Sequence, residues 1–430
     1  MSVAASPSTI TPAARLRGTL ELPGDKSIAH RALIIGALSG GPAAVTVRSP
    51  GDDVLSTVAC LRELGVTVSD DGDGTVHRYL VSGRPSRDAT LDCGNSGTTM
   101  RLLAGALAGL PLRVELDGDE SLRARPMERV ESLLRSTGAE VTTTDGHAPM
   151  TVTGRRRLTA VTHRLPVASA QLVGAASLAA LAAQGETRIE APGPTRDHTE
   201  RMLASAGVLI RRSGTVTTVD GPARPRPLSV EVPGDASSAA PWLVAGAVHP
   251  DADITLAGVG LNPTRTALVD VLRRAGVDVT ATVAGLRGGE PVGEVRVRGG
   301  HLLAPVRVAG AEVAPLIDEL PLLGVLMAAT GGELRDASEL RVKESDRIAS
   351  MVAGLAAIGA SVSELPDGWL VSPGRPRDAG IVTHGDHRIA IAFAVAALAG
   401  VASSVELDDP ACVAVSYPTF WEHLARVAAA

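Results

Sequence analysis

The sequence contains few aromatic residues and has no excess of positive charge. Three Trp, two Tyr and two Phe are its only aromatic residues among 430. It therefore has little material for the aromatic platforms on which single-stranded nucleic acids stack. The formal net charge of −6 also disfavours a nucleic-acid partner, because such proteins need clustered Lys and Arg.

Cysteines and long hydrophobic runs are scarce as well. The three cysteines, Cys60, Cys93 and Cys412, fit neither a disulfide framework nor a zinc site by number or spacing, so we expect a reducing, cytoplasmic environment. No apolar run reaches the roughly 18 residues of a membrane helix, and no signal-peptide core is visible. We expect residues 1 to about 13 to be a loose leader.

The rest of the composition is typical of a globular protein. Hydrophobic residues make up 45% of the chain and charged residues 20%, which suffices for a sizeable core. At roughly 150 residues per domain, this length predicts two or three domains.

One sequence element recurs six times. Each copy has a small or polar start, a helix rich in Ala, Leu, Val and Ile, and a Gly or polar stop. An amphipathic element follows each copy, and in the first five repeats it has a terminal Gly and leads into a strand-like run. We predict an α/β fold of six repeats, although any α/β protein rich in Ala and Gly would show a looser form of this pattern. The copies start at Asp25, Asn95, Ala168, Asp235, Asp318 and Asp386, 67 to 83 residues apart.

A longer repeat predicts two lobes of three repeats each. The stretch Leu22-Pro-Gly-Asp returns 210 residues later as Val232-Pro-Gly-Asp. The N-terminal strand at residues 16–22 would supply the strand that the sixth repeat lacks. The predicted boundaries are 24–232 for one lobe and 1–23 plus 233–430 for the other, discontinuous lobe.

The starts of the six helices are the predicted functional positions. A helix N-terminus has unpaired N–H groups and a partial positive charge, and both attract anions. Six such starts facing one cleft would bind a strongly anionic ligand. The candidate residues there are Lys26, Ser27 and Arg31; Asn95, Ser96 and Gly97; Ser169 and Gln171; Asp318 and Glu319; and Asp386, His387 and Arg388.

Lysine is the rarest cation. The chain has two lysines among its 41 Lys and Arg residues. Arg is a rigid planar fork, whereas Lys is a compact, flexible charge whose pKa is easily tuned. Both lysines lie in dense polar runs, Lys26 in LPGDKSIAHR and Lys343 in RVKESDR. Their scarcity makes both candidates for catalysis.

Simpler explanations exist for each of these features. Asp25 and Asp235 are favourable N-cap residues, and RVKESDR would suit a solvated helix face with ion pairs at helical spacing. A metal site is a further alternative, although its candidate ligands lack a recognisable zinc spacing. Those candidates are His384, Asp386, His387 and the pair Asp197 and His198.

Taken together, eight motifs resemble the enolpyruvyl transferase family, and within it the EPSP synthases. The resemblance covers nearly the whole chain from about Leu16. It implies a two-lobed inside-out α/β barrel with buried helices, built from six βαβαββ repeats. The motifs, in the family's order, are LPGDKSIAHR, GNSGTTMR, RARPM, ASAQ, TRDHTE, IDELP, RVKESDR and GDHRIA.

This resemblance implies a reaction between two small anions. The enolpyruvyl group of phosphoenolpyruvate would be transferred to the 5-hydroxyl of shikimate 3-phosphate with release of phosphate, a step towards chorismate and the aromatic amino acids. No metal or organic cofactor is implied. The resemblance also favours a cytoplasmic monomer without nucleic-acid or membrane partners.

Residue roles follow from the same resemblance, with the active site in the cleft between the lobes. Asp318 is the expected base at the 5-hydroxyl, Glu344 the expected proton donor to phosphoenolpyruvate, and Lys26 the expected contact to both substrates. The residues expected to hold shikimate 3-phosphate are Lys26, Ser27, Arg31, Ser169, Arg196 and Lys343. Those expected to hold phosphoenolpyruvate are Gly97, Arg125, Gln171, Arg347 and Arg388, the last two as bidentate forks on its carboxylate. Asn95, Ala170 and His387 complete the predicted substrate-binding set.

Two positions depart from the family pattern. Val415 stands where many members have a lysine that reaches phosphoenolpyruvate. Arg196-Asp197-His198 stands where many have a tyrosine against the substrate ring, so we expect Arg196 to take over contacts in that region.

The nearest alternative function is that of a UDP-N-acetylglucosamine enolpyruvyl transferase. Members of that group typically have a cysteine at the position of Glu120, and Lys-Asn in place of Lys26-Ser27. Two alternatives come from other functional classes: a metal-dependent hydrolase and a non-catalytic six-repeat binding scaffold.

Overall fold

The computed structural model describes residues 9–429, and the chain divides into two compact units. Unit 2 is the continuous stretch Gly24–Pro233 together with the short segment Leu286–Glu290. Unit 1 comprises Met1–Pro23, Gly234–Gly285 and Pro291–Ala430. The chain therefore passes from one unit to the other after Pro23 and after Pro233, at the two Pro-Gly steps, and again on either side of Leu286–Glu290.

Three sheets make up the strand layers described in unit 2. The first has the order β15-β3-β5-β4, the second β6-β7-β9-β8, and the third β10-β12-β14-β13 with β11 also paired to β12. Their bounds, in that order, are Ser229–Glu231, Gly40–Arg48, Val76–Gly83 and Thr67–Asp70; Ala89–Asp92, Arg113–Asp117, His147–Thr153 and Glu140–Thr144; and Leu158–Thr159, Ala183–Glu190, Val216–Gly221, Ile210–Ser213 and Thr162–Arg164.

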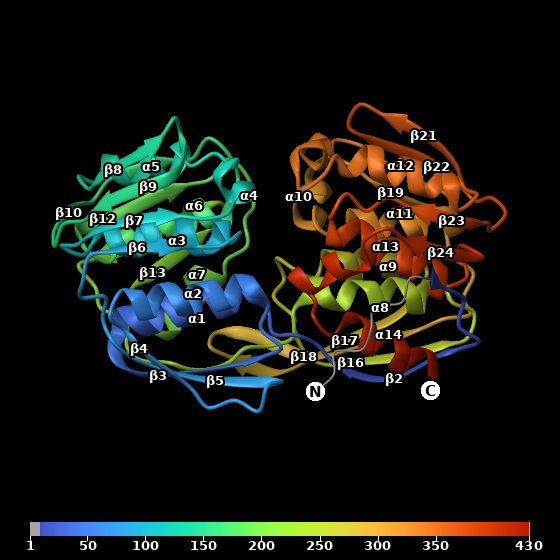
Figure 1. Ribbon diagram of the computed structural model, residues 1–430, viewed down its shortest axis with the longest axis horizontal. Helices are drawn as coiled ribbons and strands as arrows, with labels where there is room; N and C mark the ends of the chain where they lie inside the picture. The colour runs from blue at the N-terminus through green and yellow to red at the C-terminus, as the bar shows by residue number, and fades with distance from the viewer. Residues whose placement is uncertain (1–8, 430) are drawn as a thin grey trace. The chain divides into compact units, whose positions relative to one another are not determined.

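The helices of unit 2 form a buried group and an outer group. In Figure 1 the sheets of this unit surround the buried helices α1 (Lys26–Ser39), α3 (Gly97–Ala108) and α6 (Ala170–Ala180). Nearly every residue of these three helices is buried, which is why their sequences are apolar on all faces. The outer helices are α2 (Asp52–Glu63), α4 (Glu120–Arg123), α5 (Glu128–Ser136) and α7 (His198–Ser205).

Small residues allow the buried helices to approach closely. The helix α3 contacts both α1 and α6. A side chain at Gly105 would collide with the backbone of Ala175 on α6, so glycine is required at this crossing. The starts of α3 and α6 are thereby held beside each other.

Unit 1 repeats the same arrangement. Its sheets have the orders β17-β18-β16-β2, β19-β20-β22-β21 and β1-β24-β23. Their bounds, in that order, are Asp278–Arg287, Glu290–Arg298, Ala252–Gly260 and Leu16–Glu21; Val306–Val308, Gly332–Leu334, Gly368–Ser372 and Ser361–Leu365; and Thr9–Ile10, Ser404–Leu407 and Asp378–Ile381.

The buried helices of unit 1 are α8 (Ala236–Val248), α11 (Leu320–Thr330) and α13 (His387–Leu398), which contact one another. They lie inside the sheets of the unit (Figure 1). The amphipathic helices are α9 (Ala267–Arg274), α12 (Arg347–Ala357) and α14 (Phe420–Ala429). The short helices are α10 (Val313–Leu316), η1 (Gly310–Glu312), η2 (Ser338–Val342) and η3 (Pro410–Val415).

Each unit has its own hydrophobic core. The described chain combines six sheets with buried helices, which agrees with the predicted α/β class. Among the described residues, no single helix is long and apolar enough to cross a membrane. The segments Gly310–Leu316 and Leu320–Thr330 are long and apolar enough only when taken together, and they are bent by 118° relative to each other.

Two predictions about the N-terminus are wrong. The strand β2 pairs in parallel with β16 in the first sheet of unit 1, rather than completing the last repeat. The last sheet instead receives β1, whose Thr9 and Ile10 pair with Glu406 and Val405. The predicted loose leader is therefore anchored from Thr9 onward, and its residues 1–8 lie outside the described part of the chain. These pairings join residues more than 230 positions apart, which local sequence patterns do not reveal.

Candidate active site

The start of α1 carries a paired lysine. Asp25 is the N-cap and accepts a hydrogen bond from the backbone N–H of Ile28 (3.1 Å). The next residue, Lys26, lies 3.0 Å from Asp53 on α2, and its side chain is 39% exposed. Burial alone would raise the pKa of Asp53, but Lys26 and the ring of His30 hold it below its ordinary value. The carboxylate of Asp53 therefore orients Lys26, a role that the sequence did not suggest.

Arg31 lies one turn further along α1 and is buried. Its Nε donates to the hydroxyl of Thr199 on α7 (2.7 Å), and its Nη1 donates to the carbonyl of Ser27 (2.8 Å). Burial lowers the pKa of Arg31, with Glu200 and Asp25 opposing the shift. The predicted partner Arg196 is half-buried and close enough for its charge to lower the same pKa. Arg31 and Arg196 therefore form a positive region beside the start of α1.

The start of α3 has a second positive region. Ser96 caps the helix through the N–H of Thr99 (3.2 Å), and Asn95 lies half-buried just before it. A Cβ on Gly97 would come within 2.5 Å of a guanidinium nitrogen of Arg101 and 3.5 Å of one of Arg125. Glycine thus leaves the helix start open between two arginines.

Arg101 is a residue of this region to which the sequence patterns assigned no role. It donates to the side-chain oxygen of Gln171 (2.9 Å) and to the carbonyl of Pro126 (3.2 Å). Burial lowers its pKa to about 10, and the charges of Arg125 and Arg129 act in the same direction. Arg101 ends the GNSGTTMR motif, one helical turn after Gly97. This spacing could have identified it as a residue near the helix start.

The start of α6 joins this group through Gln171. Ser169 caps α6 by accepting from the N–H of Leu172 (3.4 Å), and Ala170 is its first residue. The amide nitrogen of Gln171 donates to the hydroxyl of Thr98 on α3 (2.9 Å), while its oxygen accepts from Arg101. Unit 2 therefore brings the starts of α3 and α6 together.

Unit 1 has a buried ion pair at the start of α13. The carboxylate of Asp386 caps this helix through the N–H of Arg388 (2.9 Å). It also accepts from Nε (2.8 Å) and Nη2 (3.2 Å) of Arg347, and the exposed fractions of the two side chains are 0% and 2%. Burial alone would raise the pKa of Asp386, but Arg347 lowers it. His387 follows as the first, buried residue of α13.

Arg347 contacts two carboxylates of unit 1. Its Nε and Nη2 already face Asp386, and Nη2 also lies 2.7 Å from the carboxylate of Glu344. In this arrangement the same two nitrogens are not free to grip a substrate carboxylate as a fork. The pairing does bring the predicted proton donor Glu344, whose side chain is 43% exposed, to this helix start.

The RVKESDR run is not a helix face. The helix η2 ends at Val342, and α12 begins only at Arg347, where Asp346 caps it through the N–H of Ala349 (3.0 Å). Lys343 lies in the break between these helices and pairs with Glu339. Its side chain is 24% exposed.

Asp318, the predicted base, lies just before α11 beside an arginine that the sequence analysis missed. Arg265 is 3.9 Å from Asp318 and 3.3 Å from Asp235, and only 5% of its side chain is exposed. It also donates to the hydroxyl of Ser237 (2.6 Å), which in turn contacts Glu319 (2.5 Å). Arg265 thus links Asp318 to the start of α8.

The metal-site alternative gains no support. His198 is buried and lies 2.9 Å from the buried carboxylate of Glu290, whereas Asp386 is engaged by Arg347. Among the residues that the structure describes, no group of three or more His, Cys, Asp or Glu side chains is arranged to hold a metal ion. Val415 lies at the end of η3, so the position where many family members have a lysine carries no charge here.

The predicted site residues thus fall into two sets. The set in unit 2 comprises Lys26, Ser27, Arg31, Asn95, Gly97, Arg125, Ser169, Ala170, Gln171 and Arg196, and the set in unit 1 comprises Asp318, Lys343, Glu344, Arg347, His387 and Arg388. Within each set, helix starts and charged side chains lie together, which suits anions.

Comparisons with known proteins identify the family of the chain. Residues 10–424 match the EPSP synthase (3-phosphoshikimate 1-carboxyvinyltransferase) family. A 3-phosphoshikimate 1-carboxyvinyltransferase of Gloeobacter violaceus is 48% identical over 427 residues, covering 97% of this chain and 98% of its relative. The structure of an EPSP synthase from Acinetobacter baumannii superimposes with a TM-score of 0.87 at 35% identity, covering 97% of both chains.

A more distant structure shows the same fold. The crystal structure of an enolpyruvyl transferase from Streptomyces tendae is 21% identical, with a TM-score of 0.73 over 97% of this chain and 96% of that one. The sequence match, the similarity of the solved structures and the charged helix starts lead to one conclusion: the chain belongs to the EPSP synthase (3-phosphoshikimate 1-carboxyvinyltransferase) family of transferases.

Proposed function

We propose that this protein transfers the enolpyruvyl group of phosphoenolpyruvate to the 5-hydroxyl of shikimate 3-phosphate. The hydroxyl oxygen forms a bond to C2 of phosphoenolpyruvate while its proton leaves and C3 gains a proton. Elimination then breaks the C2–O bond to phosphate and removes a proton from C3, which restores the double bond. The products are 5-enolpyruvylshikimate 3-phosphate and phosphate, and this chemistry needs no cofactor.

The observation that carries the proposal is the group of cations at helix starts in unit 2. Each substrate phosphate brings about −1.5 to −2 charges. Lys26, Arg31, Arg101 and Arg125 lie at or near the starts of α1 and α3, where the helix dipoles add to their charge. We assign Arg101 a positioning role, because it orients Gln171, the predicted contact to phosphoenolpyruvate.

Acid–base chemistry is assigned to unit 1. Asp318 accepts the proton of the 5-hydroxyl, and Arg265 lies 3.9 Å from its carboxylate and positions it. Glu344 exchanges the proton with C3, and Arg347 holds its carboxylate in place. Lys343 and Arg388 neutralise the charge of a substrate carboxylate or phosphate. Arg347 contacts substrate through Nη1 only, because its Nε and Nη2 face Asp386.

This mechanism requires both units to act on one pair of substrates, so neither set of residues suffices alone. We further propose that the protein works as a cytoplasmic monomer on these small molecules, without nucleic-acid or membrane partners. The UDP-N-acetylglucosamine reaction is not favoured, because the matching family and the relatives at 48% and 45% identity carry the shikimate name.

Product identification tests the proposal. The purified protein is incubated with millimolar phosphoenolpyruvate and shikimate 3-phosphate, and the mixture is analysed by mass spectrometry. We expect a new species with the mass of shikimate 3-phosphate plus the enolpyruvyl group, formed only when both substrates are present. Absence of this species from a folded preparation would refute the proposed reaction.

A further inference from the structure

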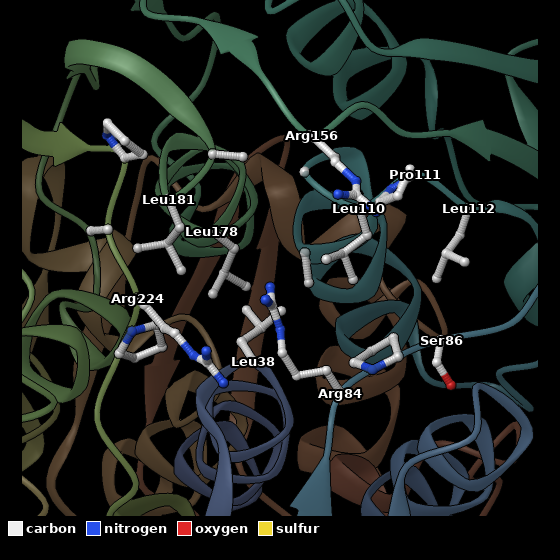
Figure 2. Close-up of a pocket in the computed structure, with 17 residues that line it drawn as sticks. Leu38, Arg84, Ser86, Leu110, Pro111, Leu112, Arg156, Leu178, Leu181 and Arg224 are labelled. Carbon is white, nitrogen blue, oxygen red and sulfur yellow. The ribbon is translucent and has the colours of Figure 1, made fainter.

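A cavity of about 830 Å³ in unit 2 lies apart from the predicted substrate-binding residues. Figure 2 shows it between Leu38, Leu110 and Leu181. None of the predicted site residues is among the described residues that line it. Small-molecule sites typically enclose about 300–1,000 Å³ and combine an apolar lining with a few polar groups, and this cavity has both properties.

The cavity lies at the far ends of the buried helices. Leu38, Ala106 and Leu178 stand near the C-terminal ends of α1, α3 and α6, respectively. The predicted substrate-binding residues lie at the N-terminal ends of the same helices. At 1.5 Å per residue, the two ends are separated by about 12–18 Å along each helix, so the cavity is a separate place in the fold.

Three arginines line the cavity. Figure 2 shows the guanidinium groups of Arg84 and Arg224 beside Leu38, and that of Arg156 beside Leu110. No Asp or Glu occurs among the described lining residues. Leucine, alanine and proline side chains supply much of the remaining surface.

These arginines lack carboxylate partners, in contrast to several other arginines of the unit. Arg188, for example, pairs with Glu190. Within residues 9–429, Arg84, Arg156 and Arg224 form no ion pair, and Arg224 only donates its Nε to the carbonyl of Ser39 (2.9 Å). Three unneutralised charges in one recess attract an anion.

Two of the cations are also close to each other. Side chains of Arg84 and Arg224 both border Gly40, since a Cβ at this glycine would collide with both of them. Burial lowers the pKa of Arg84, and the charge of Arg224 lowers it further. An anion bound between these side chains would relieve their repulsion.

We propose that this cavity binds a small amphipathic anion, with an aromatic ring system against Leu38, Leu110 and Leu181 and an acidic group among Arg84, Arg156 and Arg224. The leucines provide an apolar surface for the ring, and the arginines provide donors for a carboxylate or sulfonate. A ring without the acidic group lacks the charge interaction and binds weakly.

The probe for the test is 8-anilinonaphthalene-1-sulfonate, which combines aromatic rings with one anionic group. Its fluorescence is titrated with the full-length protein and with the double variant Arg84→Gln/Arg156→Gln. These two residues form no hydrogen bond within the described chain, so the variant should keep the circular dichroism and enzymatic turnover of the unmodified protein. The control is Arg78→Gln/Arg157→Gln, which removes two exposed charges of the same unit outside the cavity.

We expect saturable binding of the probe to the unmodified protein and to the control, and at least a tenfold higher Kd for the cavity variant. Benzoate should displace the probe, whereas benzyl alcohol at the same concentration should not. The proposal is wrong if the unmodified protein shows no saturable binding, if the cavity variant and the control bind equally well, or if benzyl alcohol competes as strongly as benzoate.

Discussion

Replacing Asp386 by Asn should destabilise unit 1 far more than the same change at a similar but exposed position. Asp386 caps α13 and faces the buried guanidinium of Arg347. Asn caps helices about as well as Asp, so the substitution mainly removes a negative charge. It leaves Arg347 buried with Glu344 as its remaining charged partner.

The magnitude follows from burial. Breaking a buried ion pair by removing one partner costs about 3–5 kcal/mol. Because Arg347 keeps its contact with Glu344, we expect Asp386→Asn to lower the free energy of unfolding by about 3 kcal/mol. Asp346 is the matched control, because it caps α12 and pairs with Arg341 while its side chain is 41% exposed. A pair at that exposure contributes about 0.2–1 kcal/mol.

Tryptophan fluorescence during urea unfolding measures the difference, because all three tryptophans belong to unit 1. With a slope of about 1–3 kcal/mol per molar urea, Asp386→Asn should lower the midpoint by roughly 1–3 M and Asp346→Asn by much less. Equal shifts in the two variants would refute the argument from burial. The three residues that report are Trp242, Trp369 and Trp421.

Three further changes test other parts of the structure. Lys26→Ala should abolish turnover and lower the unfolding midpoint only slightly, because its ion pair with Asp53 is partly exposed; near-normal activity would remove this lysine from the mechanism. Burial lowers the pKa of His30 from 6.5 to about 3, so only the unfolded chain takes up this proton as the pH falls below 6.5. The free energy of unfolding should drop by about 2 kcal/mol between pH 7 and pH 5 through this group. The His30→Asn variant should lose that dependence, as followed by urea denaturation at both pH values, whereas His147→Asn should keep it. Arg265→Gln should lower kcat, because Arg265 links Asp318 to the start of α8; an unchanged kcat would show that Arg265 does not position this base.

The helix starts were predictable because helix capping is local. Ser96, Ser169 and Asp386 each accept a hydrogen bond from a backbone N–H within their own first turn. The predicted start at Asp318 was less accurate, since α11 begins at Leu320 and Glu319 makes no side-chain cap. A helix start can therefore be recognised in the sequence only where a side chain caps it.

The supporting charges were not predictable, because they come from distant parts of the chain. Asp53 follows Lys26 by 27 residues, and Arg265 precedes Asp318 by 53. Neither spacing matches a helical or strand period, so no pattern marks these pairs. The same limit explains why β2 was assigned to the wrong sheet, since its partner β16 lies more than 230 residues away.

The most direct test of the proposed function is phosphate release from phosphoenolpyruvate, measured in parallel with two acceptors. We predict continuous release with shikimate 3-phosphate and none above background with UDP-N-acetylglucosamine or without an acceptor. Release with UDP-N-acetylglucosamine, or no release with shikimate 3-phosphate at millimolar concentrations, would contradict the proposed function.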